Sequence, residues 1–233
     1  MQTVLYGPSG LPLNPQTGAI VDPSSAAMRA TLKPLEYQYQ GALGGHYRLA
    51  LPLTGGLTGI GAGGIILGFR WAPTTPGLLA ILKRISASAA TRTTAGSTAF
   101  ALAFDAVKVT GYSAQHNAGG AAVSFGSGQK MRSSMGNTQA AVYYSNSSTV
   151  ISGGTGVADT NAFGIWQFDE QPVTTGVIRM GVPGDIYKDD TQAAHAEVFG
   201  PNEGFYIRFA AAQGTSAVTD AVVMIEWAEA LQY

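Results

Sequence analysis

An all-β protein, built as an antiparallel β-sandwich with an extended N-terminal arm, is the fold that the sequence predicts. Glycine accounts for 31 of the 233 residues, with many Ala, Ser and Thr besides, which favours short strands and turns over long helices. From residue 46 onward, short apolar or alternating segments recur between turn-forming residues. Prolines and glycines within residues 1–45 exclude a continuous strand or helix there. The predicted organisation is therefore an arm, 1–45, and a sandwich domain, 46–233.

The strands of the sandwich are predicted from alternation with a period of two. In residues 99–109, Phe100, Leu102 and Phe104 fall on one face, as in a strand with one buried side. Residues 77–86 and 220–231 also have helical spacing, and we assign both to strands because so many neighbouring strands need partners. The predicted strands are 46–51, 65–71, 77–86, 99–109, 139–144, 163–168, 176–180, 204–210 and 221–231, and the long loops are 86–98, 111–120, 145–161 and 188–197.

The N-terminal arm carries apolar side chains that need a buried environment. One short helix is predicted at 23–32, with Asp22 as its N-cap and Pro23 in its first position. The arm either crosses the surface of another subunit or packs on its own domain, and the sequence leaves both arrangements open. The candidate interface residues are Leu5, Tyr6, Leu11, Leu13, Leu35, Tyr37 and Tyr39.

Charged residues are scarce, which restricts the classes of partner. Thirteen basic and 14 acidic residues make up 12% of the chain, about half of the usual share of roughly 25%. Because phosphate binding needs a cluster of Lys and Arg, we expect no nucleic-acid partner. No apolar run approaches the ~18 residues of a membrane helix, and the first residues lack the pattern of a signal peptide. We expect a protein made in the cytoplasm, with no membrane partner and, without any cysteine, no thiol chemistry.

The stretch GIGAGG, residues 59–64, matches the G-x-G-x-x-G fingerprint of dinucleotide-binding loops. That loop must open a helix, whereas the residues that follow, IILGFRW, are typical of a strand. No acidic residue lies at the expected distance downstream. We therefore predict a glycine turn between two strands and no bound cofactor, and we expect valine at Gly61 and Gly63 to damage folding or assembly.

Other chemical motifs also favour structural interpretations. The S-x-x-K match at Ser127–Lys130 lies between glycines, which predicts a loop rather than an acyl-transfer site. The three tryptophans lie in predicted strands and are expected to fill the core. They are Trp71, Trp166 and Trp227.

The histidines and clustered acidic residues are the remaining candidates for a metal or catalytic site. The histidines lack a second ligand at the spacing of a metal site, so we expect surface or turn positions and no metal. Paired acidic residues could bind a hard cation or cleave a sugar, although such pairs are usually solvated loop charges. The residues concerned are His46, His116 and His195, and Asp169, Glu170, Asp185, Asp189 and Asp190. Because no nucleophile, base and orienting group form a set, we expect no enzymatic activity and no catalytic residue.

Several segments, in order GALGGHYRLAL, FRW, LLAILKRISAS, GQKMRSSMG, NEGFYIR and IEWAE, together resemble structural proteins of tailed bacteriophages. The resemblance spans about residues 42–229. It implies a sandwich of jelly-roll type in the virion, in particular a capsid decoration or cement protein that clusters as a trimer near threefold positions. The landmark residues, for structure or for contacts, are Gln129, Lys130, Met131, Arg132, Asn202, Glu203, Gly204, Glu226 and Trp227.

Two functional hypotheses follow, and a third is weaker. The first is a non-enzymatic protein on the outside of the capsid that binds the major capsid protein and stabilises the shell, with its arm holding the capsid or a sister subunit. The second is a tail, baseplate or head-fibre module that binds host-surface glycans through its long loops. The third is a small hydrolase that uses the paired acidic residues.

Overall fold

The computed structural model describes residues 44–92, 100–170, 179–189, 196–214 and 217–231, together with four two-residue strands nearer the N-terminus. The chain divides into two compact units, residues 1–35 and 36–233. This division lies about ten residues before the boundary predicted at 45 and 46, whereas the first strand of the sandwich begins at Gly45.

Unit 1 contains four short antiparallel strands in the order β1-β2-β3-β4. Met28–Arg29 is a strand where the sequence predicted a helix over 23–32, and the other residues of that predicted helix lie outside the described residues. Pairing with β3 supplies backbone partners that the helix prediction did not consider. The strands are β1 (Leu5–Tyr6), β2 (Pro12–Leu13), β3 (Ile20–Val21) and β4 (Met28–Arg29).

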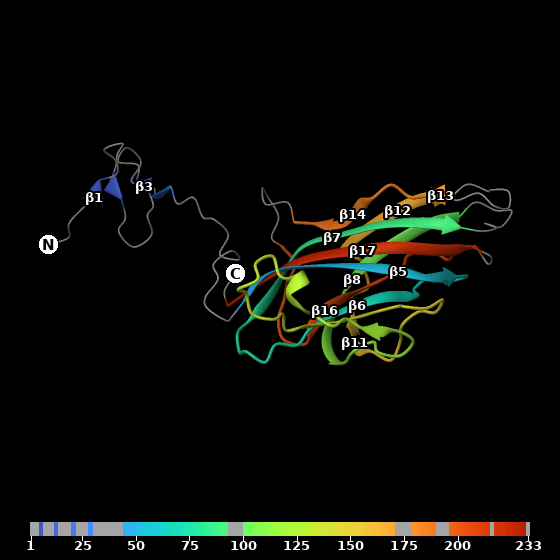
Figure 1. The fold of residues 1–233 in the computed structure, drawn as a ribbon, viewed down its shortest axis with the longest axis horizontal. Coiled ribbons are helices and arrows are strands. Elements are labelled where there is room, and N and C mark those ends of the chain that lie inside the picture. The colour runs from blue at the N-terminus through green and yellow to red at the C-terminus, as the bar shows by residue number, and fades with distance from the viewer. Residues whose placement is uncertain are drawn as a thin grey trace. The chain divides into compact units, whose positions relative to one another are not determined.

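Unit 2 is an antiparallel β-sandwich, as the sequence predicted (Figure 1). In its first sheet, β8 (Phe100–Ala114), β16 (Glu203–Phe209) and β6 (Ile65–Trp71) are central. β10 and β9 follow β6, and β11 and β12 both pair with the other side of β8. The four outer strands are β9 (Ala121–Ala122), β10 (Ala140–Tyr144), β11 (Thr155–Ala158) and β12 (Gly164–Glu170).

The second sheet has the order β13-β7-β17-β5, with β14 and β15 also paired to β7. Its long members are β5 (Gly45–Thr58), β7 (Leu79–Arg92) and β17 (Val218–Ala230). Figure 1 shows these three side by side as one layer. The short members are β13 (Arg179–Met180), β14 (Gly184–Lys188) and β15 (Val198–Phe199).

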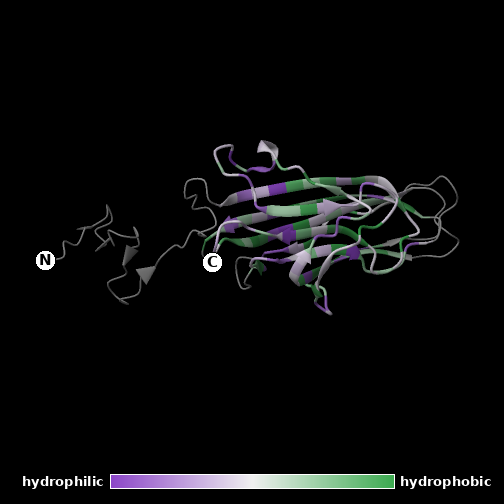
Figure 2. Ribbon diagram, turned by 90° about the horizontal axis from the view of Figure 1, so that it is seen from below, coloured by the Kyte–Doolittle hydropathy of each residue, from purple (hydrophilic) through white to green (hydrophobic). Residues whose placement is uncertain are grey.

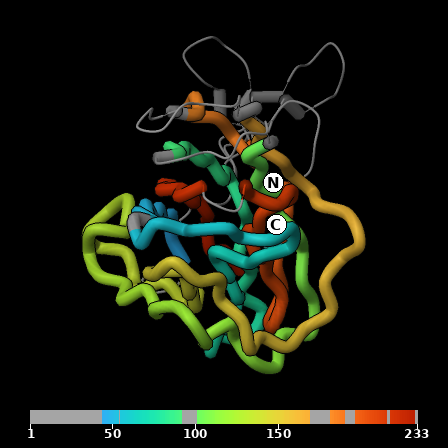
Figure 3. Tube along the Cα trace, turned by 90° about the vertical axis from the view of Figure 1, so that its right-hand side faces the viewer, coloured from blue at the N-terminus to red at the C-terminus, as the bar shows by residue number. Residues whose placement is uncertain are grey.

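Consecutive long strands alternate between the two sheets. The chain passes from β5 to β6, β7 and β8, changing sheet each time, and after β12 it passes through β14, β16 and β17 in the same way. The connections between β8 and β12 loop around the outside of the strands, as the yellow-green tube in Figure 3 shows. Four strands of one sheet are therefore ordered β14-β7-β17-β5 and four of the other β12-β8-β16-β6.

The core lies between the two sheets and is strongly aromatic. Trp71 and Trp227 have no exposed surface and Trp166 is 7% exposed, so the prediction of core tryptophans is confirmed. Phe69 stacks on Phe205 with ring centroids 5.0 Å apart. Hydrophobic and hydrophilic residues alternate along the strands in Figure 2, as expected when each sheet buries one face.

The edge strand of the second sheet, β5, pairs with β17 on one side. On its other side the His46 carbonyl accepts a hydrogen bond from the Met131 amide at 2.9 Å, so the backbone of His46 points away from β17. Because the direction of the backbone groups repeats every two residues along a strand, those of Arg48, Ala50 and Pro52 also point away from β17. Pro52 has no N–H, and at this position its ring removes no bond from the ladder with β17.

The glycine-rich stretch 59–64 is a turn between β5 and β6, and no helix follows it. Its amides donate within the protein: Gly59 to the Ala217 carbonyl at 3.3 Å, Gly63 to the Phe209 carbonyl at 2.8 Å and Gly64 to the Gly61 carbonyl at 3.1 Å. Ile60 donates to Gln213 Oε1 at 2.9 Å. Because these amides are already bonded, they cannot also form a phosphate cradle.

Alanine at Gly63 is expected to destabilise the protein, whereas alanine at Gly61 is expected to be tolerated. Gly63 has a φ of 83°, a conformation that costs a residue with a side chain about 1–2 kcal/mol. No atom lies within 4 Å of a Cβ at Gly61, so the sequence-based expectation of damage holds for Gly63 alone. Urea unfolding of Gly63→Ala and Gly61→Ala measures the difference, and equal losses in the two variants would contradict this account.

Candidate functional site

The acidic residues proposed for a cation or sugar site are divided among separate ion pairs. Asp185 Oδ1 lies 2.6 Å from Arg84 Nε, and Asp189 Oδ2 lies 2.6 Å from Lys83 Nζ. Asp169 and Glu170 belong to β12, but their side chains, and all of Asp190, lie outside the described part of the structure. Within that part, no three His, Asp or Glu side chains are grouped closely enough to hold a metal ion.

His116 lies in a loop, as the sequence predicted, but it is not a surface residue. It follows the end of β8, but its side chain is only 8% exposed and packs against two tyrosines. Burial lowers its pKa from the usual value of 6.5. His46 is half-buried at the start of β5, and His195 lies outside the described residues.

Ser127–Lys130 does not form an acyl-transfer site. Ser127–Gln129 is a single short 3₁₀ turn, while Lys130 forms an antiparallel bridge with Tyr47 of β5. The turn instead positions Gln129, whose Oε1 accepts a hydrogen bond from the Gly126 amide at 2.8 Å.

A charged cluster that the motif search missed surrounds Tyr187 at one end of the sandwich. Lys83 and Asp189 form a pair whose side chains are 14% and 7% exposed, and Lys108 pairs with Glu197 at 3.0 Å. The Tyr187 hydroxyl accepts a hydrogen bond from the Glu197 amide at 2.9 Å. Each of the two cations has its own carboxylate, so this balanced network holds β7, β8 and β14 together and leaves neither cation to bind an anionic ligand.

Lys83 reaches Asp189 because β7 contains a bulge. Glu226 of β17 is opposite Arg84, and the next residue, Trp227, is opposite Leu82, so Lys83 is the extra residue where the register shifts. A bulge re-aims the extra side chain. Here it directs Lys83 toward β14 and the residue that follows it.

Glu229 is another buried ionisable residue that no sequence motif indicated. It lies at the end of β17, is 3% exposed and accepts hydrogen bonds from Trp227 Nε1 at 3.1 Å and from the Thr138 hydroxyl. Desolvation raises its pKa from 4.5 to about 7, because these donors and the Gln139 amide offset only part of the cost of burying a charge. Its hydrogen-bond partners among the described residues are two side-chain donors and a backbone amide, so the raised pKa indicates a structural carboxyl rather than a general base.

The outward side of the second sheet is the best candidate for an interaction surface. Val222 and Met224 of β17 are 39% and 41% exposed there. Their neighbours across the sheet are small or apolar, so a continuous patch of the sheet carries no charge at its centre. We call it the open face and define it by Ala50, Pro52, Ser86, Ser88, Ala90, Val222 and Met224.

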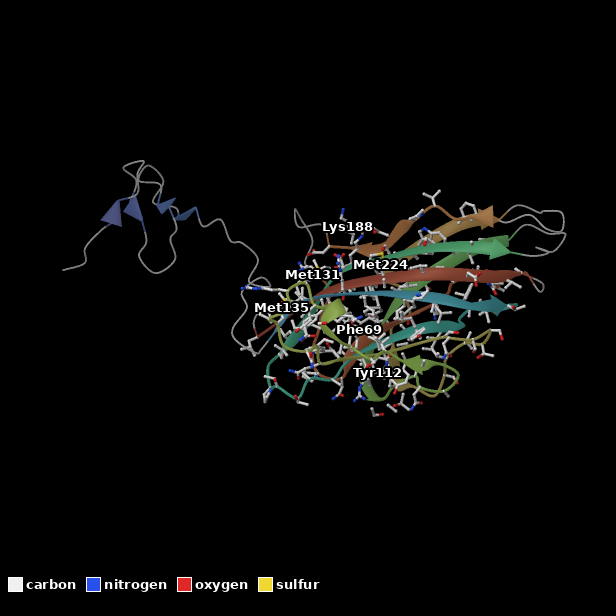
Figure 4. All side chains as sticks on the ribbon, in the orientation of Figure 1. Phe69, Tyr112, Met131, Met135, Lys188 and Met224 are labelled. Carbon is white, nitrogen blue, oxygen red and sulfur yellow. The ribbon has the colours of Figure 1, made fainter. Side chains whose placement is uncertain are left out.

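A groove runs along the open face between β17 and the segment before β14. It is lined by residues of β7, of β17 and of the segment before β14, namely Ser88, Ala89, Ala90, Asp220, Ala221, Val222, Gly181 and Pro183. Figure 4 shows Met224 on the second sheet and Tyr112 at the opposite side of the sandwich, with Phe69 between them. The described residues thus leave this face without a covering element.

The other residues singled out from the sequence have structural roles or lie outside the description. Gly204 approaches β6 so closely that a Cβ would lie 2.0 Å from the Phe69 carbonyl oxygen, and Asn202 accepts a hydrogen bond from Arg70 Nη2 at 2.6 Å. Met131 is 47% exposed. Among the candidate interface residues, Leu5, Tyr6 and Leu13 lie in β1 and β2, with side chains that are not described, and Leu11, Leu35, Tyr37 and Tyr39 lie outside the described residues.

Comparison of the chain with protein-family models, with curated proteins and with solved structures finds no match. In the part of the chain that the structure describes, no helix has the length and apolar character needed to cross a membrane.

Proposed function

We propose that the protein is a non-enzymatic structural protein of a bacteriophage virion that binds the outside of the capsid shell and stabilises it. The observation that carries the proposal is the open face, where exposed Val222 and Met224 lie among uncharged residues of a rigid sheet. Interfaces between proteins are depleted of charged residues at their centre, and exposed apolar patches mark contact sites. The partner is the major capsid protein, and the protein is a homotrimer in the virion.

We further propose that the sandwich is of the jelly-roll type. The strand orders β14-β7-β17-β5 and β12-β8-β16-β6 support this, since consecutive strands exchange between two four-stranded layers as in a pair of Greek keys. Jelly rolls occur in viral capsids and in lectins alike, so the fold supports both a shell protein and a glycan-binding module. The open face favours the shell protein, because its exposed large side chains, Val222 and Met224, are apolar.

Lysine at Met224 is expected to abolish attachment to capsids without unfolding the protein. The side chain is on the open face, where a buried, unpaired ammonium would cost several kcal/mol in an interface. The measurement is cosedimentation of purified protein with particles that lack it, with antibody labelling of particles to locate it. Met131→Lys is the matched control, since Met131 is similarly exposed but is not one of the residues of the open face, and its amide bonds to His46 at the start of β5.

Each outcome of this experiment separates the hypotheses. The proposal is supported if the Met131→Lys variant attaches to the particles, the Met224→Lys variant does not, and the antibody labels the head of the particle. Label at the tail would support the glycan-binding module instead. Equal attachment by both variants would overturn the role of the open face.

A further inference from the structure

The segment after β8 folds back over the outward side of the first sheet and is fastened there by two buried side chains. Gln115 Nε2 donates to the Gly68 carbonyl at 2.9 Å and to the Ala141 carbonyl at 3.2 Å, joining the segment to β6 and β10. His116, the next residue, is buried to the same extent. We call residues 115–120 the latch segment.

The His116 ring fills the space between the sheet and a second segment, residues 150–154. Its edge contacts with Tyr112 of β8 and Tyr206 of β16 have centroid separations of 5.6 and 5.8 Å. A Cβ at Gly154 would lie 2.4 Å from the ring, so the second segment presses directly on it. The two segments are also joined by paired hydrogen bonds between Ala118 and Ser152, at 3.1 and 2.9 Å.

Burial of the ring disfavours its charged form. Nδ1 lies 3.3 Å from the Tyr112 hydroxyl, which donates to it when the ring proton is on Nε2. A second ring proton would occupy Nδ1, so the Tyr112 hydroxyl would have to rotate and accept from the ring instead of donating to it. Burial of the Tyr112 phenol raises its pKa, so it cannot supply a compensating negative charge.

Among the described residues, no carboxylate on the neighbouring strands is available to stabilise a charged ring. The charged residue of β6 is Arg70. On β16, Arg208 lies over the Tyr206 ring. The carboxylate of Asp105 on β8 is bound by Arg208. The other charged groups on these strands are engaged elsewhere, Lys108 with Glu197 and Glu203 with the Gly200 amide. The remaining titratable side chains there are Tyr112, Tyr143, Tyr144 and Tyr206. The segments 115–120 and 150–154 carry no charged side chain besides His116.

We propose that His116 is a proton-operated latch: protonation of its ring releases residues 115–120 and 150–154 from the sheet and exposes Tyr112 and Tyr206 beneath them. The released ring gains hydration, and the segments lose the contact that joins them to β8 and β16. The newly exposed surface is apolar, because Tyr112 and Tyr206 form one cluster with Val107 and Val109. Acidification thus uncovers a second contact surface, on the sheet opposite the open face.

Hydrogen exchange of the full chain at pH 7.5 and pH 5.5, corrected for intrinsic rates, tests the latch. The opening equilibrium of the latch segment is expected to rise over this range, by up to about tenfold, since the open ring titrates near 6.5 and the closed ring below it. Protection in β17 and β7 is expected to stay unchanged. His116→Phe keeps an aromatic ring without a titrating group, so its latch segment is expected to open equally at both pH values.

Two results would overturn the latch. One is equal protection of the wild-type latch segment at both pH values, and the other is the same increase in His116→Phe. If His116→Phe does not fold, an NMR titration of the His116 ring in the wild type decides the question. A ring that titrates at or above 6.5 would overturn the proposal, and one that titrates below 6.5 while the Tyr112 and Tyr206 signals shift with it would support it.

Discussion

Replacing Trp227 by alanine is expected to lower the free energy of unfolding by about 4 kcal/mol, the largest effect of a single core substitution in this protein. The indole has no exposed surface and stacks on Tyr47 with centroids 5.5 Å apart. It also meets Phe69 edge-on at 5.5 Å and Phe125 at 6.0 Å. The cavity would be lined by rigid aromatic rings that are anchored on both sheets, so little relaxation can fill it.

The loss has a polar component as well, because Trp227 Nε1 donates to Glu229. Trp227→Phe keeps most of the packing and removes this donor, so it separates the two contributions. Urea unfolding at pH 7 is the measurement. Met224→Ala, three residues away on the outward side of the same strand, is the control and is expected to change stability by no more than about 0.5 kcal/mol. A Trp227→Ala variant as stable as this control would refute the packing described here.

Glu229→Gln is expected to remove a fall in stability that the wild type undergoes as the pH rises from 4.5 to 7. Over this window the folded protein holds a proton on Glu229 that the unfolded chain has released, because burial raises the pKa to about 7. The free energy of unfolding therefore decreases as the pH rises, by up to roughly 3 kcal/mol in total. Glutamine offers an acceptor to the same donors and does not titrate.

The measurement is the stability difference between wild type and Glu229→Gln at several pH values. This difference cancels the opposite effect of His116, whose lowered pKa makes the protein lose stability as the pH falls below about 6.5. Glu226→Gln, on the outward face of the same strand, serves as the control. Parallel pH curves for wild type and Glu229→Gln would show that the carboxyl is solvated.

The strands were predictable where apolar residues form a short run between turn-forming residues or alternate with polar ones. Residues 65–71 form β6 as predicted, and 204–210 differs from β16 by one residue at each end. The same alternation predicts the inward row Val223, Ile225, Trp227 and Glu229, which signals a buried carboxyl that the motif search overlooked.

The helical spacing within 77–86 has a physical origin in the bulge of β7. Leu82 and Ile85 both face the core although they are three residues apart, because Lys83 is the extra residue of the bulge. On each side of the bulge, every second residue faces the core. Where the two alternating series meet, the core-facing residues have the spacing of one face of a helix. Two consecutive polar residues between buried ones, Lys83 and Arg84, are the signal that identifies such a junction.

Other features depend on contacts that the sequence does not reveal. Residues 86–92 and 111–114 were predicted as loops, but they continue β7 and β8 because β17 and β11 pair with them. All of β11 is exposed, so it has no hydrophobic pattern to detect. His116 is buried because Tyr206 and Gly154, both distant in sequence, lie beside it.

The proline at position 52 affects how copies of this protein behave when crowded together. At this edge of the second sheet, a strand from a neighbouring copy would have to bond to the outward row of β5, and Pro52 interrupts the donors of that row. Continuous strand pairing through this edge is thereby disfavoured, although the sheet presents apolar side chains beside it. The proline thus opposes edge-on pairing along β5 without altering the side chains that the open face presents.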